Sequence, residues 1–438
     1  MSKLAIFGGK KAVTCTEGDL FTWPIINKAM EEAVLKVLRE GNMSGSDVTK
    51  EFERKYADWH GMKYGLGFNN GTASLQSAFF GLGLGCGDEI ISSAVTYWAT
   101  CLPALSLGCR VVFADILPDT LCMDPDDIEK RITPRTKAIV VVHYLGMPAD
   151  MDRIMKIARK HKLKVVEDVS HAHGALYKGK MTGTIGDVSC YSLMSGKSFA
   201  VGEAGIMLTN DKKIYERAIM FGFYERHGDV QDKELRKASG LPWGGYKYRM
   251  HQLSAAVGIE QLKKYPKEMA EIDKSMNYFW DLLEGVPGLK AFRPSKKSGS
   301  TMGGWYAPHG LYVPEELEGL SVARFSEAVR AEGAPCNPGC NLAMHTHPIF
   351  NTLDVYGHGR PTNAAYLPKG ANPKPPKLPV CEGIQARTYN IPYFKKFRKK
   401  DIEQYAAAFR KAAENYQELL AGDKGNAQSG QYGLFARR

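Results

Sequence analysis

The sequence has no long hydrophobic run. No stretch approaches the roughly 18 consecutive apolar residues that a membrane-spanning helix requires, so we expect no membrane partner. The opening MSKLAIFGGKKAV also lacks the apolar core and cleavage site of a secretory signal peptide. These absences predict a cytoplasmic protein.

Cysteine pairs at metal-ligand spacing are also missing. Nine cysteines are spread from Cys15 to Cys381, and the only close pair is Cys336 and Cys340. No set of His or Cys partners follows that pair at the spacing of a zinc site. Such cysteines are typical of free thiols in a reducing compartment. The sequence therefore predicts neither a disulfide framework nor a bound metal.

The balance of residue types is that of an ordinary globular protein. The 438 residues are 44% hydrophobic and 24% charged, which excludes collagen, coiled coil and wholesale disorder. The length is sufficient for two domains with a sizeable core. We find no internal repeat.

Acidic residues are fewer than basic ones, with 47 Asp and Glu against 58 Lys and Arg and a formal net charge of +11. Residues 360–400 hold ten of the basic residues and a single acid, Glu382. A basic excess is compatible with nucleic acid, anionic membranes or anionic small molecules. No aromatic–basic module supports nucleic acid, so we expect none. Residues 360–400 are either a solvated basic face or a surface that attracts anionic substrates.

Strand-like and helix-like segments alternate between about residues 65 and 210. Nearly continuous apolar runs rich in β-branched residues are typical of strands buried on both faces of a sheet. They are residues 110–116, 138–146, 164–170, 188–194 and 205–210. Because the amphipathic segment 150–162 separates two of them, the pattern predicts an α/β fold with a mostly parallel sheet.

The remaining chain divides into a second, smaller unit and a tail. The spacing of apolar residues predicts further helices at 24–40, 48–60, 251–285, 321–332 and 401–420. Four prolines exclude regular structure at 371–379. We predict a large domain with its N-terminal segment over residues 1–270, a smaller C-terminal α/β domain over 271–420, and a mobile tail over 421–438.

Asp168 follows a predicted buried strand at its carboxyl end, where open α/β sheets place ligand-binding groups. A carboxylate there can hold a cationic ring nitrogen, and His171 is close enough in sequence to reach the same ligand. The alternative is that Asp168 caps a helix and His171 is an ordinary loop residue.

Lys197 lies in a glycine-rich segment between two predicted strands. Glycines such as Gly196 and Gly202 let the backbone approach a ligand closely. A partly desolvated lysine there can form a Schiff base, and Ser192 adds a hydroxyl donor. The alternative is a surface lysine in a hairpin.

The segment from Asn70 through Thr72 and Ala73 opens a helix after a strand. Its free N–H groups and positive dipole end make an anion site. The alternative is plain helix capping by Asn70 or Thr72.

Together these fragments are more specific than any one of them. Their order is the anion loop, the aromatic segment VTYWAT at 95–100, Asp168 with His171, and Ser192 with Lys197. This order fits pyridoxal phosphate, which needs a phosphate cradle, an aromatic partner, a carboxylate for its ring nitrogen and a lysine for its aldehyde.

The sequence resembles the DegT/DnrJ/EryC1/StrS aminotransferases over about residues 4–420. The blocks that carry the resemblance include NNGTASL, VTYWAT, VVEDVSHAHGA, SLMSGKSFAVGEAG and GGYKYRMHQLSAAVG. The resemblance implies the aspartate-aminotransferase-like fold of type I pyridoxal-phosphate-dependent transferases, and a homodimer with shared active sites.

The resemblance also implies a role for each matching residue. Lys197 would form the Schiff base with pyridoxal 5′-phosphate and move the proton, and Asp168 would pair with the pyridinium nitrogen. His171 would hydrogen-bond the phenolic oxygen of the cofactor, and Tyr97 would stack on its ring. The phosphate-binding positions match Thr72, Ala73 and Ser192.

Lys247 departs from the common family pattern. Many members have Asn there, which reaches the cofactor phosphate of the neighbouring subunit. A lysine can still bind phosphate as a point charge. The alternative is that Lys247 is solvated at the rim of an interface.

The activity that the resemblance implies is transamination by a ping-pong mechanism, with pyridoxamine 5′-phosphate as the second form of the cofactor. L-Glutamine or L-glutamate is the expected donor. The opening LAIFGGKKAV and the length above 400 residues resemble the keto-cyclitol and aminobenzoate-forming branch of the family more than the shorter nucleotide-sugar branch. The expected acceptor is a keto-cyclitol or keto-sugar, in aminosugar or secondary-metabolite biosynthesis such as that of antibiotics. The alternatives are a nucleotide-linked keto-sugar and a non-catalytic cofactor-binding regulator. In the loop 336–350, His345 and His347 are candidate substrate contacts.

Overall fold

The computed structural model describes residues 3–368, 370–371 and 374–426. Within them, the centre is a seven-stranded sheet in the order β1–β9–β8–β5–β4–β2–β3. Its strands are β1 (Tyr64–Phe68), β2 (Glu89–Ser93), β3 (Arg110–Ala114), β4 (Thr136–Val142), β5 (Lys164–Asp168), β8 (Val188–Ser192) and β9 (Gly205–Thr209). Strand β9 is antiparallel to β1 and β8, and the other pairs are parallel, which confirms the predicted mostly parallel sheet.

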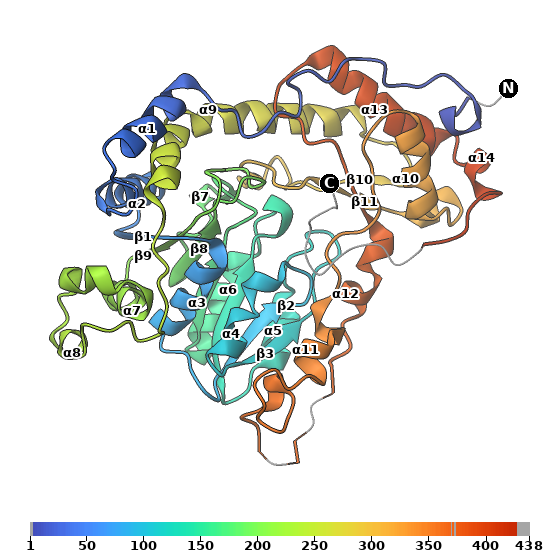
Figure 1. Ribbon diagram of the computed structural model, residues 1–438. Coiled ribbons are helices and arrows are strands. Elements are labelled where there is room, and N and C mark those ends of the chain that lie inside the picture. The colour runs from blue at the N-terminus through green and yellow to red at the C-terminus, as the bar shows by residue number, and fades with distance from the viewer. Residues whose placement is uncertain (1–2, 369, 372–373, 427–438) are drawn as a thin grey trace.

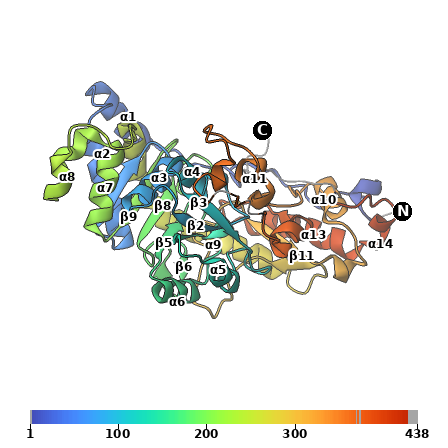
Figure 2. The ribbon, with the colours of Figure 1, turned by 90° about the horizontal axis from the view of Figure 1, so that it is seen from below.

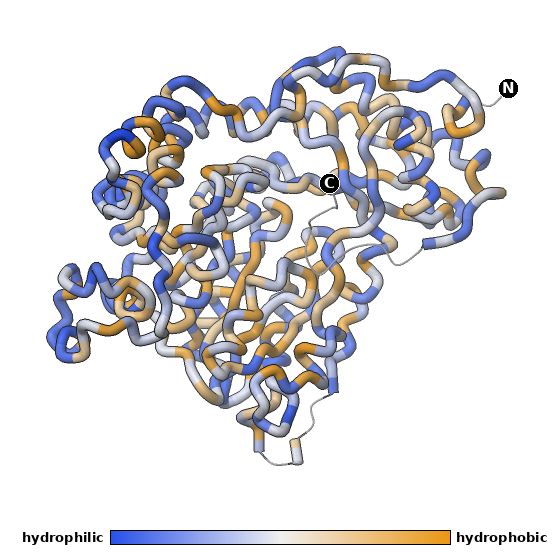
Figure 3. Tube along the Cα trace, in the orientation of Figure 1, coloured by the Kyte–Doolittle hydropathy of each residue, from blue (hydrophilic) through white to orange (hydrophobic). Residues whose placement is uncertain are grey.

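Helices cover this sheet and connect its parallel strands (Figure 1). They are α1 (Lys28–Arg39), α2 (Asp47–His60), α3 (Gly71–Gly81), α4 (Pro103–Ser106), α5 (Pro125–Arg131), α6 (Met151–His161), α7 (Lys212–Gly222), α8 (Lys233–Lys237) and α9 (Gln252–Leu282). The helix predicted from residue 24 begins later because the Asn27 side chain accepts a hydrogen bond from the Met30 amide and caps it there. Figure 3 shows hydrophobic residues along the strands, which are buried.

The C-terminal part of the chain forms a smaller layer around an antiparallel sheet. This sheet contains β10 (Leu289–Ala291), β11 (His309–Tyr312) and β12 (Thr388–Asn390), and a separate small hairpin is formed by β6 (Leu176–Tyr177) and β7 (Lys180–Met181). The helices are α10 (Val322–Ala331), α11 (Pro348–Asn351), α12 (Pro379–Gly383), α13 (Lys399–Glu414) and α14 (Gln417–Leu420). Figure 2 shows α7 and α8 at one end of the molecule and α10, α13 and α14 at the other.

The helix predicted over 401–420 is divided into α13 and α14. The side-chain amide of Asn415 donates to the Lys411 carbonyl oxygen at 2.8 Å and ends α13. Beyond α14, Asp423 accepts hydrogen bonds from the amide and hydroxyl of Ser321 at the start of α10. The rest of the predicted tail, 427–438, lies outside the described residues.

Helix α9 joins the two layers. Its beginning packs on α1 and α2, and its far end lies beside α13 (Figure 1). The predicted domain boundary at residue 270 falls inside this one helix. The division into residues 1–270 and 271–420 therefore stays a prediction.

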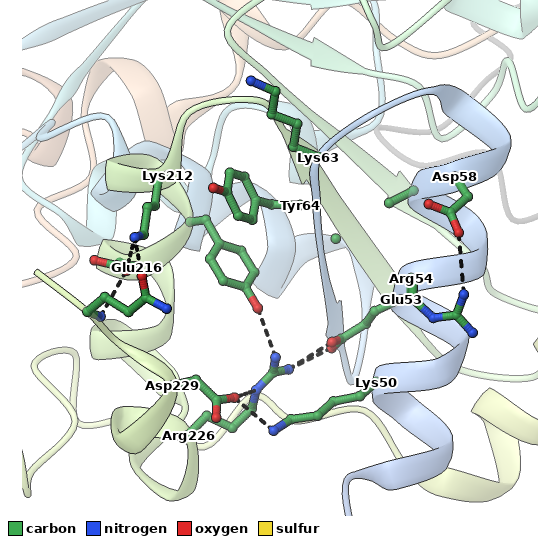
Figure 4. Close-up of a pocket in the computed structure, with 14 residues that line it drawn as sticks. Lys50, Glu53, Arg54, Asp58, Lys63, Tyr64, Lys212, Glu216, Arg226 and Asp229 are labelled. Atoms are coloured by element: carbon green, nitrogen blue, oxygen red, sulfur yellow. Dashed lines mark hydrogen bonds and ion pairs between the residues drawn. The ribbon is translucent and has the colours of Figure 1, made fainter.

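A charged pocket between α2 and α7 has a structural role. It encloses about 350 Å³. Figure 4 shows Arg226 between Glu53 and Asp229. Nη1 of Arg226 donates to Glu53 Oε1 at 2.8 Å, and its Nε donates to Asp229 Oδ2 at 3.2 Å. The guanidinium also donates to the Tyr215 hydroxyl at 2.9 Å. Because the buried Glu53 and Arg226 neutralise each other, the pair ties α2 to the segment after α7.

The basic stretch 360–400 is not a uniform charged face. Arg387 pairs with Glu315, Lys396 with Glu271, and Arg398 with Asp19 and Asp401. Part of its excess charge is therefore offset by carboxylates from other segments.

Candidate active site

A pocket opens at the carboxyl ends of β5 and β8, beside the N-terminus of α3. It has about 200 Å³ of free volume. It is lined by Asn70, Gly71, Thr72, Leu75, Tyr97, Ala99, Asp168, Ser170, His171, Ser192, Met194, Lys197, Glu203 and Tyr306. Among the residues predicted from the sequence, Thr72, Tyr97, Asp168, His171, Ser192 and Lys197 therefore lie together.

Asp168 is held at the end of β5 by two hydrogen bonds. The Thr100 hydroxyl donates to Oδ2 at 2.7 Å, and the Ser170 amide donates to Oδ1 at 3.1 Å. Thr100 is itself hydrogen-bonded to Thr96 at 2.9 Å. The side chain is buried, so these partners fix the direction in which its oxygens point.

Lys197 lies in the loop between β8 and β9 and is 7% exposed. Its ammonium group is 4.0 Å from the centre of the Tyr306 ring. The backbone of Lys197 is fixed as well, because its amide donates to the Met194 carbonyl and its carbonyl accepts from the Trp23 indole at 2.8 Å. The lysine is therefore desolvated and positioned, as the loop pattern predicted.

His171 is electrically neutral in this pocket. Burial, followed by the positive charge of Lys197, lowers its pKa well below the ordinary histidine value. Its Nδ1 accepts from the Leu145 amide at 3.3 Å, which places the proton on Nε2. The ring of Tyr306 lies 4.5 Å away. His171 is thus available as a hydrogen-bond donor without carrying charge.

The N-terminus of α3 approaches the end of β8 closely. A Cβ atom on Gly71 would lie 2.8 Å from the Ser192 Cβ, so only glycine fits there. The side-chain oxygen of Asn70 accepts a hydrogen bond from the Ala73 amide at 2.8 Å. The Ala73 amide, which we predicted to bind phosphate, is therefore already bonded within the protein. The amides of Gly71 and Thr72 lie in the first turn of α3, so the helix itself does not use them and they are available to an anion.

Tyr306 is a pocket residue that the sequence did not single out. It lies between Trp305 and Ala307, whose φ angles of 54° and 45° are in the left-handed region. The Trp305 indole donates to Asp273 at 2.8 Å and anchors this loop. Strained backbone of this kind is concentrated at functional sites. In the sequence, the adjacent glycines Gly303 and Gly304 are the one sign of unusual backbone near Tyr306.

Ala73 is not part of the pocket lining, and three further predicted residues lie outside this pocket. The Lys247 ammonium is 6.0 Å from the centre of the Tyr224 ring. His347 caps α11, because its Nδ1 accepts a hydrogen bond from the Ile349 amide at 3.2 Å. His345 is buried and hydrogen-bonds Glu382 at 3.1 Å. Their roles toward phosphate or substrate stay predictions.

All nine cysteines are free thiols, which confirms that prediction. In the part of the chain that the structure describes, no group of three or more His, Cys, Asp or Glu side chains could hold a metal ion. In the same part, no helix is long and apolar enough to cross a bilayer.

The sheet order, the buried lysine and the carboxylate at the end of β5 define a pyridoxal-phosphate-dependent aminotransferase of the aspartate-aminotransferase-like class. Residues 24–410 match the DegT/DnrJ/EryC1/StrS aminotransferase family, and the chain belongs to it.

Named relatives agree with this assignment. The chain is 30% identical to an L-glutamine:2-deoxy-scyllo-inosose aminotransferase from Streptomyces fradiae, over 96% of this chain and 99% of that protein. It is 30% identical to a GDP-perosamine synthase from Caulobacter vibrioides, over 82% of this chain and 88% of the relative. The solved aminotransferase from Psychrobacter cryohalolentis superimposes with a TM-score of 0.78 at 26% identity, covering 91% of this chain and all of that one.

Behind the Lys197 loop, Lys395 is buried with no hydrogen-bond acceptor among the described residues. Its ammonium lies against the rings of Tyr393 and Trp23, at 3.0 and 4.4 Å from their centres. These contacts offset part of the desolvation, but burial still lowers the pKa of Lys395 well below the ordinary lysine value.

A substitution at Lys395 should change how stability depends on pH. Because the folded-state pKa lies below the unfolded one, the unfolded chain binds more protons and wild-type stability rises with pH. We expect Lys395→Met to raise Tm at pH 7, by an amount that shrinks as pH approaches the ordinary lysine pKa of about 10.4. Calorimetry at several pH values measures this, with Lys400→Met on the exposed side of α13 as control. A lower Tm with an unchanged pH dependence would contradict it.

Proposed function

We propose that this enzyme transfers an amino group from L-glutamine or L-glutamate to a keto-cyclitol by a ping-pong mechanism. The observation that carries the proposal is the buried Lys197 in one pocket with Asp168 and the N-terminus of α3. The Streptomyces fradiae relative supports the donor and the acceptor, because its name gives glutamine and a scyllo-inosose. Aminosugar or antibiotic biosynthesis is the setting that this acceptor class suggests.

The residues of the pocket fit pyridoxal 5′-phosphate. When bound, this cofactor supplies an electron-accepting ring that stores and releases an amino group. Asp168 would hold its ring nitrogen in the protonated form, and the Nε2–H of His171 would donate to its phenolic oxygen. Tyr97 would cover the ring. The phosphate would be held by Thr72, Ser192 and the free amides of α3.

Lys197 would carry the cofactor at rest and move the proton during transfer. A general base must lie close to the proton that it removes, and the Lys197 side chain lines the same pocket as Asp168 and His171. The contact with Tyr306 limits the directions that the freed amine can take. Because Lys197 is buried, water would also have little access to the cofactor atom that receives the proton.

Two other readings differ in what they predict. A nucleotide-linked keto-sugar acceptor is favoured by the similarity to GDP-perosamine synthase. A non-catalytic regulator on the same fold would bind the cofactor but never exchange its amino group. The hydrogen-bonded Asp168 and the buried Lys197 favour catalysis, because a binder needs neither.

Replacement of Lys197 tests the site. After incubation with pyridoxal 5′-phosphate and reduction with borohydride, mass spectrometry should find the cofactor on the peptide that contains Lys197. Lys197→Ala should lose this label and the visible absorption of the bound cofactor, whereas Lys180→Ala on the small hairpin should keep both. A label on another lysine, or a colourless wild type, would refute the assignment.

The acceptor class is tested with the pyridoxamine 5′-phosphate form of the enzyme. We expect keto-cyclitols such as scyllo-inosose derivatives to return it to the pyridoxal form faster than nucleotide-linked keto-sugars do, as followed by absorbance. A faster reaction with the nucleotide-linked compounds would select the alternative acceptor. No conversion by L-glutamine or L-glutamate in the first half-reaction would argue for the regulator.

A homodimer with shared active sites follows from the family resemblance. Lys247 would then reach the phosphate in the other subunit. Light scattering after size-exclusion chromatography should give twice the chain mass of 48.4 kDa. Lys247→Glu should weaken cofactor binding because it places a carboxylate near the phosphate, and Lys247→Asn should retain it. A monomer that binds the cofactor normally would remove the role of Lys247.

A further inference from the structure

The N-terminal segment, residues 4–25, is bound to the C-terminal layer. Figure 1 shows it running from beside α10 and α14, over α13, to α1. The buried Glu332 at the end of α10 accepts a hydrogen bond from the Ala5 amide at 2.7 Å. Gln404 of α13 accepts one from the Thr14 amide at 2.8 Å. The course of the segment is therefore fixed before it reaches the large sheet.

Trp23 of this segment is held on both sides along the chain. The Leu20 carbonyl oxygen accepts a hydrogen bond from the Lys395 amide at 2.8 Å, and the Ile25 carbonyl oxygen accepts one from the ammonium group of Lys264 in α9. The Lys395 ammonium also lies 4.4 Å from the centre of the Trp23 ring. The indole therefore has little freedom to move.

The Trp23 indole reaches the loop that carries Lys197. Its Nε1–H donates to the Lys197 carbonyl oxygen at 2.8 Å. On the other side of the same Cα atom, the Lys197 amide donates to the Met194 carbonyl oxygen at 2.8 Å. Because a peptide group is planar, these two bonds fix the planes on both sides of the Lys197 Cα, and with them the direction of its Cβ.

The neighbours of Lys197 show why a contact from outside the loop matters. Gly196 precedes the lysine, and glycine has the widest range of backbone conformations. Phe199 packs edge to face on the Tyr265 ring, 5.1 Å away, and holds the far side of the loop. The bond from Trp23 adds control of the residue whose amine faces the pocket.

We propose that Trp23 is a positioning residue for Lys197. Its indole N–H, placed by the N-terminal segment, fixes the direction in which the lysine side chain leaves the backbone. A reactive group must be held within about 0.5 Å of its productive place by the contacts behind it. The inference rests on the proposed role of Lys197 in cofactor binding, whereas the hydrogen bond itself belongs to the protein without cofactor.

Three variants separate the hydrogen bond from the ring. Trp23→Phe removes the indole N–H and part of the ring. Trp23→benzothienylalanine has sulfur in place of the N–H and keeps the shape of the ring. Trp280→Phe in α9 is the matched control, because it loses the same atoms although its Nε1 has no partner among the described residues.

Hydrogen exchange of the cofactor-free protein is the first measurement. Residues 193–202 contain amides that bond within the loop, including that of Ser195. The loss of one hydrogen bond should make the peptide that spans them exchange about two- to tenfold faster in both variants of Trp23. The control Trp280→Phe should exchange at the wild-type rate there, with each protein measured equally far below its own Tm.

The visible circular dichroism of bound pyridoxal 5′-phosphate is the second measurement. It depends on how the ring is oriented in the site, which a contact that only supports the fold would leave unchanged. Both variants of Trp23 should show an altered dichroic band and bind the cofactor about two- to tenfold more weakly. The control Trp280→Phe should match wild type in both respects.

Wild-type exchange in both variants of Trp23 would overturn the proposal, and so would faster exchange with an unchanged dichroic band. It would also be overturned if Trp23→benzothienylalanine matched wild type while Trp23→Phe did not, because the ring and not the N–H would then hold the lysine. A wild-type protein that bound no cofactor would refute only the proposed function, since the exchange measurement needs none.

Discussion

The close approach of α3 to the end of β8 and the start of β9 is the contact on which the rest of the site depends. A side chain on Gly71 would collide with Ser192, and one on Gly205 would lie 2.4 Å from the Asn70 carbonyl oxygen. Because neither position has a Cβ, the N-terminus of α3 packs directly against the edge of the sheet. The loop that carries Lys197 leaves from the same two strands. The anion-binding end of the helix and the reactive amine are thus placed by one packing contact.

Three ionisable groups in the pocket, Asp168, His171 and Lys197, are contacted by different parts of the fold. The Thr100 turn orients the Asp168 carboxylate, and burial keeps His171 neutral while the Leu145 amide selects its tautomer. Tyr306 comes from the C-terminal layer and covers the Lys197 amine. His171 and Lys197 are nevertheless coupled, because the charge of Lys197 contributes to lowering the pKa of His171 and both side chains lie against the Tyr306 ring.

The sequence predicted the residues whose signals are local. Asp168 at a strand end, Lys197 among glycines and Thr72 at a helix start could be found because each pattern occupies a few neighbouring positions. Tyr306 could not, since it reaches Lys197 only after the C-terminal layer has folded against the sheet. The break between α13 and α14 was missed because it depends on the side chain of Asn415 bonding back to Lys411 rather than on apolar spacing.

Helix α9 has a mechanical consequence for the enzyme. It begins on α1 and α2, carries Asp273 against the Trp305 loop, and ends beside α13 without interruption. A rotation of the C-terminal layer therefore has no flexible linker at residue 270 to turn about. Such a rotation must bend α9 itself. The turn of α9 that contains Pro266 is the weakest, because proline donates no backbone hydrogen bond. Access to the pocket is then more easily controlled by loops than by domain rotation.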